Sequence, residues 1–197
     1  MRNSIILVIS VFVFFALQAQ PSPQSKKITK KFFPDSESLL PVTPALKKKR
    51  GYTNYKELIS FINDLKESHP SVVSIKYIGE SQKGYKIPVI QIKTISDSEK
   101  IKIWMQAGLH GNEPAGTEGL LYYMHSILNN NSYADLLEGV DLLILPMANI
   151  DGYLKDNRYA ANGLDLNRDQ TKLMAPETRL IKKVFCEFNA HVGLDFH

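Results

Sequence analysis

Cysteine is almost absent from the sequence, because Cys186 is the single example among 197 residues. No disulfide bond can therefore form within the chain, which excludes a disulfide-stabilised scaffold. A lone thiol can act as a nucleophile, but Cys186 lies between Phe185 and Phe188 in a segment with helical spacing. We interpret it as a small buried hydrophobic side chain and not as a catalytic thiol.

A strong excess of one charge is also missing from most of the chain, although its formal net charge is +4. Nine of the 24 Lys and Arg residues lie in residues 1–50, where only Asp35 and Glu37 balance them. From Gly51 onward acidic residues slightly outnumber basic residues. This part lacks the basic surface that nucleic-acid binding requires, so we predict no nucleic-acid partner.

Long apolar runs are absent except near the N-terminus, where residues 5–17 are apolar apart from Ser10. Arg2 precedes the run and Ala19 follows it, as in a secretory signal peptide. We predict a signal peptide over residues 1–19 and export to the periplasm or the extracellular space. The alternative is an uncleaved anchor, but the run is short for a membrane span. After cleavage we expect no stable membrane span.

Residues 20–50 contain five prolines and two groups of lysines, and they show no sustained hydrophobic period. This composition is typical of a basic linker or a short pro-segment. The remaining residues, 51–197, are numerous enough to bury one core, and we predict a single domain there.

Strand and helix patterns alternate within this domain. Apolar residues at helical spacing predict a first helix, with Asn54 and Glu57 as a candidate capping pair at its start. His69-Pro70 ends this helix. Pro114 and Pro176 are each suited to the start of a further helix. The nearly continuous apolar run Val140–Leu145, interrupted by Asp141 alone, indicates a strand covered on both faces. Further strands are predicted over 72–79, 87–95, 101–107 and 192–196. The pattern predicts an α/β fold with a mixed, mostly parallel sheet flanked by helices.

Three residues form a candidate metal site. His110 and Glu113 lie on a strand-to-helix turn, where α/β proteins commonly place ligands. His197 ends the final predicted strand, so it could meet them at one edge of the sheet. Imidazole and carboxylate groups bind zinc, and a catalytic site uses three protein ligands and water. The implied cofactor is Zn²⁺. Asp195 points to the opposite side of its strand by alternation, so we expect a structural role for it.

The other three histidines are weaker candidates. We predict that His69 caps a helix end, that His125 is structural in a partly apolar helix, and that His191 is exposed in a turn. In the polar loop over 149–169, two arginines offer planar guanidinium groups suited to a carboxylate or a polarised carbonyl. They are Arg158 and Arg168. A single loop arginine is more commonly a solvated charge, and we keep that interpretation for Arg179.

Four ordered blocks of this sequence resemble the zinc carboxypeptidases of the M14 family, and the similarity covers nearly everything from Tyr52 to His197. The blocks are His110-Gly111-Asn112-Glu113, Asn149-Ile150-Asp151-Gly152-Tyr153, Asn162-Gly163-Leu164-Asp165-Leu166-Asn167-Arg168 and Leu194-Asp195-Phe196-His197.

The resemblance implies a role for each candidate residue. The three candidate ligands would bind zinc, and Arg158 would polarise the scissile carbonyl and stabilise the tetrahedral oxyanion. Asn167 and Arg168 would hold the terminal carboxylate of a peptide or peptidoglycan-peptide substrate. The implied activity is hydrolysis of peptide bonds near a C-terminal carboxylate by a zinc-activated water, in a monomeric enzyme.

Two departures from the family pattern matter. The general base of the family is a glutamate well past the third ligand, as is its substrate-capping tyrosine, and the sequence ends before both. We therefore expect the 197 residues to be a catalytic domain with its C-terminal part missing, inactive alone. In addition, Asp169 stands where many members have asparagine. Its negative charge would stand beside Asn167 and Arg168, which would hold the terminal carboxylate, and this brings simple exopeptidase specificity into question.

Two other functions would use the same residues. Zinc deacylases similar to aspartoacylase and succinylglutamate desuccinylase share the His-Gly-x-Glu turn and the Asp-Leu-Asn-Arg segment. Their domain starts almost at the metal motif, whereas roughly 55 residues of ordered-looking sequence precede it here. A non-catalytic pseudoenzyme would suit the missing base, yet the ligands and arginines upstream are intact. We favour the peptidase.

Overall fold

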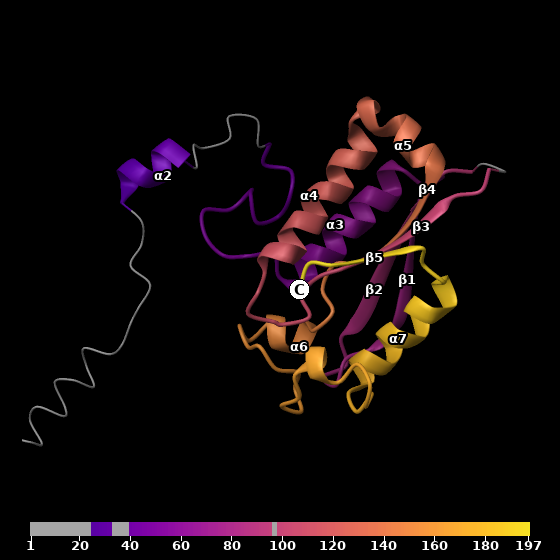
Figure 1. Ribbon diagram of the computed structural model, residues 1–197. Coiled ribbons are helices and arrows are strands. Elements are labelled where there is room, and N and C mark those ends of the chain that lie inside the picture. Colours follow the sequence, from indigo (N-terminus) through magenta and orange to yellow (C-terminus); the bar gives the residue numbers. More distant parts are fainter. Residues whose placement is uncertain (1–24, 33–39, 96–97) are drawn as a thin grey trace, which may run out of the picture. The chain divides into compact units, whose positions relative to one another are not determined.

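The computed structural model of the chain (Figure 1) describes residues 25–32, 40–95 and 98–197. The chain divides into two units, residues 1–39 and 40–197. In the first unit the described part contains helix α2 (Lys26–Phe32), whose residues are all exposed. The predicted signal peptide, residues 1–19, lies outside the described residues.

A five-stranded sheet forms the centre of the second unit, in the order β1-β2-β4-β3-β5. Strand β2 is antiparallel to both of its neighbours, whereas β3 is parallel to β4 and to β5. Four strands thus run in one direction and β2 runs in the other, which confirms the predicted mixed, mostly parallel sheet. The strands are β1 (Val73–Glu80), β2 (Lys86–Lys93), β3 (Ile101–Gln106), β4 (Val140–Leu145) and β5 (Val192–Asp195).

Helices cover both faces of this sheet. The chain passes from β3 through α4 to β4 in one direction along the sheet. It passes from β4 through α7 to β5 in the opposite direction. Because crossovers between parallel strands are right-handed, α4 and α7 lie on opposite faces (Figure 1). The helices of this unit are α3 (Tyr55–Ser68), α4 (Ala115–Asn129), α5 (Ala134–Gly139), α6 (Ile150–Tyr153) and α7 (Pro176–Phe188), with short 3-10 helices η1 (Asn131–Tyr133) and η2 (Leu166–Arg168).

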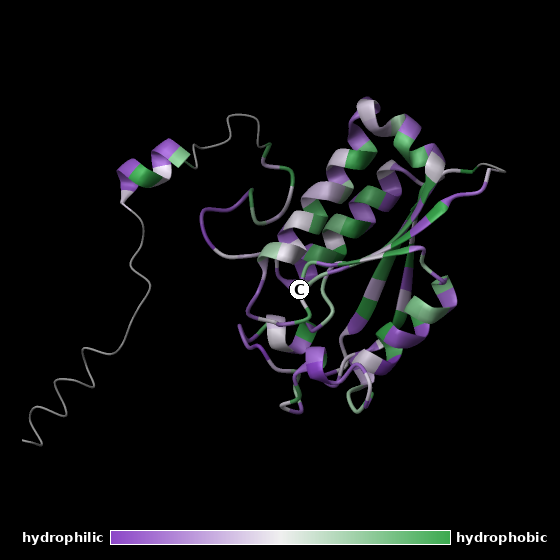
Figure 2. Cartoon of the chain, viewed as in Figure 1, coloured by the Kyte–Doolittle hydropathy of each residue, from purple (hydrophilic) through white to green (hydrophobic). Residues whose placement is uncertain are grey.

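The core lies along the central strands, where apolar residues are concentrated (Figure 2). Every residue of β4 is buried, which confirms the prediction of a strand covered on both faces. On β3, Trp104 packs edge-to-face against Phe185 of α7, with ring centroids 5.7 Å apart. Among the described residues, no helix is both long enough and apolar enough to cross a membrane.

The prediction that Cys186 is buried is wrong, because this residue is exposed. Helix α7 packs on the sheet through residues that include Ile181 and Val184. Two residues beyond Val184, a side chain points roughly 200° further round the helix, away from the sheet. The apolar neighbours in sequence did not reveal this orientation.

Residues 40–50, which we call the strap, belong to the second unit, although the sequence suggested a linker there. Thr43 is buried within it, and the Nζ atom of Lys48 lies 2.7 Å from the carboxylate of Glu57 on α3. Glu57 also completes a capping box with Asn54 at the start of α3, as the sequence indicated. The compact part of the chain therefore begins before residue 51.

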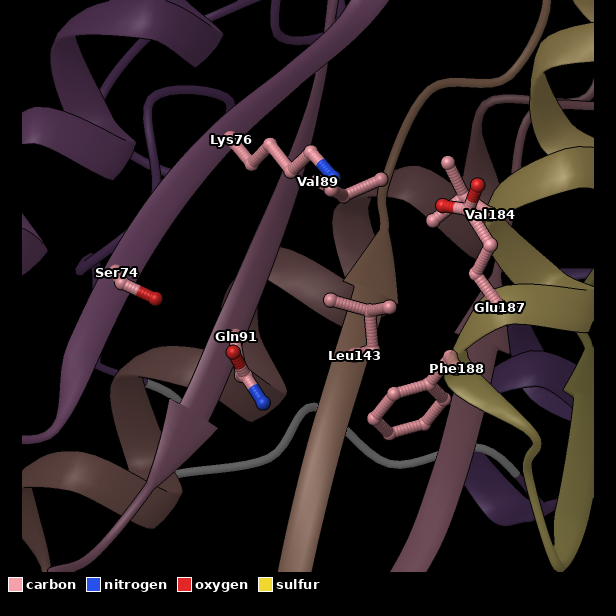
Figure 3. A pocket seen from close by; sticks show the side chains of 8 residues that line it. All are labelled: Ser74, Lys76, Val89, Gln91, Leu143, Val184, Glu187 and Phe188. Carbon is pink, nitrogen blue, oxygen red and sulfur yellow. The ribbon is translucent and has the colours of Figure 1, made fainter.

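Helix α7 covers its face of the sheet only in part. A hollow of about 200 Å³ lies between α7 and strands β1, β2 and β4 (Figure 3). No candidate site residue lines this hollow, so it is separate from the predicted metal site. Its lining residues are Ser74, Lys76, Val89, Gln91, Leu143, Val184, Glu187 and Phe188.

Candidate metal centre

The three candidate ligands follow two neighbouring strands. His110 and Glu113 come after β3, and His197 comes after β5. Because β3 and β5 are parallel neighbours, the residues that follow them meet at the same edge of the sheet. The backbone N–H of Leu109 donates to the carbonyl oxygen of His197 at 3.0 Å and joins the two segments directly.

The side chains of these residues converge. One potential ligand atom from each of His110, Glu113 and His197 lies within 4.8 Å of the other two. The two imidazole rings stand edge to face, with centroids 4.4 Å apart. His110 is fully buried, whereas Glu113 and His197 are partly exposed. The site therefore has a buried base and an open side, as a site that admits a substrate requires.

The turn that carries His110 and Glu113 packs closely on helix α6. A Cβ atom at Gly111 would lie 2.1 Å from the carbonyl carbon of Gly152 and 2.2 Å from the backbone nitrogen of Tyr153. Only a residue without a side chain permits this approach of two backbones. The glycine between the two ligands thus fixes the height of the turn above α6.

Asp165 orients the buried histidine. Its Oδ1 atom lies 3.0 Å from Nε2 of His110, while Nδ1 of the same ring faces the Glu113 carboxylate at 3.1 Å. A carboxylate accepts a proton donor, so Asp165 favours the tautomer with the proton on Nε2. The lone pair on Nδ1 is then available for a metal ion, an arrangement that metal-binding histidines commonly show. Asp165 lies within one of the motifs that resemble the zinc carboxypeptidases, but nothing in the sequence indicated this role for it.

Arg158 adds a positive charge to the same cluster. Its Nε atom donates to Oδ2 of Asp165 at 3.2 Å, and its Nη1 atom donates to Oε1 of Glu113 at 3.3 Å. Burial raises the pKa of the Asp165 carboxyl. Hydrogen bonds from His110 and the Asn167 backbone, together with the charge of Arg158, outweigh it and lower that pKa overall. Asp165 therefore stays ionised while it holds its neighbours.

Asn167 and Arg168 lie at the open side, on η2. The Nδ2 atom of Asn167 is 3.4 Å from Nε2 of His197, which brings the predicted substrate-binding segment to the metal ligands. Arg168 is exposed. Its guanidinium group makes no hydrogen bond or ion pair with the residues that the structure describes, so it is free to bind an incoming carboxylate.

The carboxylate of Asp169 has a different place from the one we expected. It is buried and accepts hydrogen bonds from the backbone N–H groups of Met174 and Ala175, both at 2.8 Å, and from the Thr178 hydroxyl. These donors stand at the start of α7. The charged carboxylate of Asp169 thus anchors the start of this helix and does not face the proposed carboxylate-binding residues Asn167 and Arg168.

The other three histidines and Asp195 do not belong to this ligand set. His69 is the C-cap of α3 and His191 is exposed, which confirms the two predictions. His125 is half-buried on α4. Asp195 accepts a hydrogen bond from the backbone N–H of His197 at 2.9 Å, so it shapes the end of β5. Within the described ranges, one group of His, Cys, Asp or Glu side chains has a geometry that could hold a metal ion.

The donor chemistry of this group fits zinc. Two imidazoles and one carboxylate form a ligand set found in catalytic zinc sites, and the hydrogen-bonded tautomer of His110 suits it. Such a set at the C-terminal edge of an α/β sheet, with the guanidinium group of Arg158 beside it, is typical of zinc hydrolases.

Comparisons with known proteins place the chain more narrowly. The family model described as zinc carboxypeptidase matches residues 58–191. The chain belongs to this family. It is 34% identical over 154 residues to carboxypeptidase 2 of Trichophyton tonsurans, a match that covers 75% of the chain. It is 30% identical over 136 residues, or 60% of the chain, to human carboxypeptidase B2.

Solved structures agree with this assignment. The carboxypeptidase A of Helicoverpa armigera superposes with a TM-score of 0.66 at 25% identity, over 72% of this chain and 44% of that one. The matches span 29% of the length of the Trichophyton protein and 32% of the human protein. The chain thus spans about a third of the length of these two curated relatives.

Proposed function

We propose that the protein containing this chain is a zinc-dependent metallocarboxypeptidase, which hydrolyses the peptide bond next to a C-terminal carboxylate. The observation that carries the proposal is the convergence of His110, Glu113 and His197. The exposed Arg168 directly follows Asn167, which contacts His197. Membership of the zinc carboxypeptidase family supports peptide substrates over the acyl-amino acids of the related deacylases.

Each of these side chains has a separate task in the proposal. His110, through Nδ1, would hold the ion together with Glu113 and His197. When bound, zinc supplies the Lewis acidity that makes water a nucleophile at neutral pH. Asp165 keeps the proton on Nε2 of His110 and so preserves the ligand lone pair.

The substrate would be held at two points. Arg168, assisted by Asn167, would bind the terminal carboxylate with two parallel hydrogen bonds. Arg158 stands beside Glu113 and would donate to the carbonyl oxygen of the scissile bond, where negative charge develops in the transition state. A peptide bound in this way has its last amide bond over the ligand set.

The N-terminal residues support a further part of the proposal, which is export to the periplasm or the extracellular space. An apolar run with Arg2 before it and Ala19 after it is typical of a signal peptide. N-terminal sequencing of the native protein should find a start close after Ala19. A native protein that still begins at Met1 would contradict cleavage.

The activity can be tested on the purified native protein that contains this chain. We expect one zinc ion per molecule and release of the last residue from N-acylated dipeptides with a free carboxylate. The matching C-terminal amides should be poor substrates. Stoichiometric zinc without any turnover would instead identify a binding module, and equal hydrolysis of acids and amides would contradict a carboxypeptidase.

A substitution of Arg168 tests the proposed binding of the substrate carboxylate. Arg168→Gln should lower kcat/KM for free-acid dipeptides by about tenfold or more, because one charge-assisted contact to the carboxylate is lost. The slow hydrolysis of the amides should be unchanged, since they offer no carboxylate. Arg50→Gln, at an exposed position of the strap, is the matched control. An equal loss for acids and amides would remove Arg168 from substrate binding.

A further inference from the structure

Glu118 lies in the first turn of α4, and its carboxylate contacts two other elements. Its Oε1 atom accepts a hydrogen bond from the backbone N–H of Thr53 at 2.6 Å, and its Oε2 atom accepts one from the Thr53 hydroxyl at 2.8 Å. Thr53 is fully buried and lies just before the N-cap of α3. The hydroxyl of Tyr153, on α6, donates to Oε1 at 3.4 Å. One carboxylate therefore joins α4 to α6 and to the start of α3.

These contacts surround the turn that carries the first two candidate ligands. The backbone N–H of Glu118 donates to the carbonyl oxygen of Pro114 at 3.0 Å, and Pro114 directly follows the ligand Glu113. At the other end of the turn, a Cβ atom at Gly111 would lie 2.2 Å from the backbone nitrogen of Tyr153. The main chain of Glu118 thus holds one end of the turn, and its side chain holds the residue on which the other end packs.

The partners of the Glu118 carboxylate are neutral. Among the described residues, no Lys, Arg or His side chain forms an ion pair with it, so its charge strengthens the hydrogen bonds that it accepts. Burial raises the pKa of the Tyr153 hydroxyl, and the negative charge of Glu118 raises it further, so this hydroxyl keeps its proton and remains a donor. A negative charge in the first turn also stabilises a helix. That effect requires neither Thr53 nor Tyr153, so the two roles can be separated.

We propose that Glu118 is a positioning residue for the metal centre. It acts through Tyr153 and Thr53, which keep α6 and the start of α3 in place around the ligand-bearing turn. Without the carboxylate, a buried N–H group and a partly buried hydroxyl would lose their acceptor, and α6 would shift beneath Gly111. The inference rests on the proposed function, because it assumes that zinc binds at this site.

Zinc binding by variants of the purified native protein tests this role. Glu118→Ala should weaken zinc binding by about fivefold, as competition with a chromogenic chelator would show. Glu118→Gln keeps an oxygen acceptor at the same distance along the side chain and should restore part of the affinity. Co²⁺ can replace zinc, and its visible absorption depends on the geometry of its ligands. This spectrum should change in Glu118→Ala and return toward that of the parent in Glu118→Gln.

A matched control separates positioning from a general loss of stability. Ile92 is buried in β2 and pairs with Leu142 near the start of β4, whereas the candidate ligands follow the ends of β3 and β5. Ile92→Val should lower the stability of the protein but leave its zinc affinity and its cobalt spectrum unchanged. An equal loss of zinc affinity in Ile92→Val would overturn the proposal.

A double-mutant cycle tests the route through α6. Tyr153→Phe removes the hydroxyl and keeps the ring, and it should weaken zinc binding by about twofold. In the Glu118→Ala background it should cause no further loss, because the contact is already absent. Additive losses, or a zinc affinity and cobalt spectrum equal to those of the parent in Glu118→Ala, would overturn the inference and leave the proposed function intact. A parent protein that binds no zinc would instead overturn both.

Discussion

Asp165 is the residue that most directly connects the parts of the metal centre. Its carboxylate contacts Nε2 of His110, Nε of Arg158 and the backbone N–H of Asn167. One side chain therefore sets the tautomer of a ligand, the direction of a guanidinium and the conformation of the substrate-binding segment. Residues of this kind that orient ligands affect metal affinity without touching the ion.

Substituting Asp165→Asn should weaken zinc binding by roughly 10–100-fold, because the amide no longer fixes the proton on Nε2 of His110. Competition with a chromogenic chelator measures the effect. Asp156→Asn is the control, since Asp156 lies in the same loop and is exposed. If both variants bind zinc as tightly as the parent, Asp165 does not orient the ligand.

Asp169 is predicted to make a pH-dependent contribution to stability. Burial raises the pKa of its carboxyl, but hydrogen bonds from Thr178, Ala175 and Met174 and the charge of Arg179 lower it more, to a value below the usual range. A carboxyl whose pKa is lower in the folded state stabilises that state above its unfolded pKa. The contribution is lost as the pH falls through the folded pKa.

Asp169→Asn should therefore cost about 2 kcal/mol of unfolding free energy at neutral pH. The difference from the parent should shrink as the pH falls below about 4, where the unfolded carboxyl is protonated. Urea unfolding at several pH values measures it, and Asp156→Asn again serves as the control. A difference that stays constant with pH would show that charge is not the cause.

At the scale of elements, the first turn of α4 and the end of β5 are in close contact. A Cβ atom at Gly116 would lie 2.6 Å from the carbonyl oxygen of Phe196 and 3.1 Å from the Cβ atom of Ala107. Phe196 directly precedes His197, so the helix and the third ligand are mechanically coupled. The small residue in α4 lets the strand end approach the turn that carries the other two ligands.

Gly116→Ala should therefore displace the end of β5 and weaken zinc binding at least severalfold, as chelator competition would show. Gly119→Ala is a matched control in the same helix, because a Cβ atom there meets nothing within 4 Å. Alanine favours a helix interior, so the control should gain about 0.5–1 kcal/mol of stability. Zinc affinity equal to that of the parent in Gly116→Ala would contradict the coupling.

At the scale of the molecule, the ligand set joins segments that are distant in the sequence. His110 follows an interior strand of the sheet and His197 follows an edge strand, so one ion would connect the turn before α4 to the end of β5. Metal that binds only the folded state stabilises it by mass action. The stability of the domain and its metal content should therefore change together.

Removal of zinc with a chelator should lower the melting temperature of the protein. With zinc at a hundred times its dissociation constant the stabilisation is about 2.7 kcal/mol, which corresponds to roughly 5–10 °C for a domain of this size. Differential scanning calorimetry measures the shift. The His110→Ala variant should show no shift on chelation, and an equal shift in that variant would mean that the metal binds elsewhere.

Much of the architecture could be predicted from local patterns. Alternation and apolar runs located all five strands, and the capping pair at Asn54 and Glu57 located the start of α3. The glycine-rich turn with His110 and Glu113, and the histidine that follows β5, were recognisable because ligand-type residues beyond strand ends can be found in the sequence. These features depend on residues close together in the chain, so periodicity and motif suffice to find them.

The tertiary structure alone decided which distant side chains meet. The contact between Asp165 and His110 joins two loops, the carboxylate of Asp169 turns into the start of α7, and Cys186 faces away from the sheet. The attachment of the strap through Lys48 and Glu57 is likewise invisible in composition. Each of these depends on how rigid elements pack and on which donor a charged group reaches in space. Hydrophobic periodicity describes the faces of one element and carries no information about its partner.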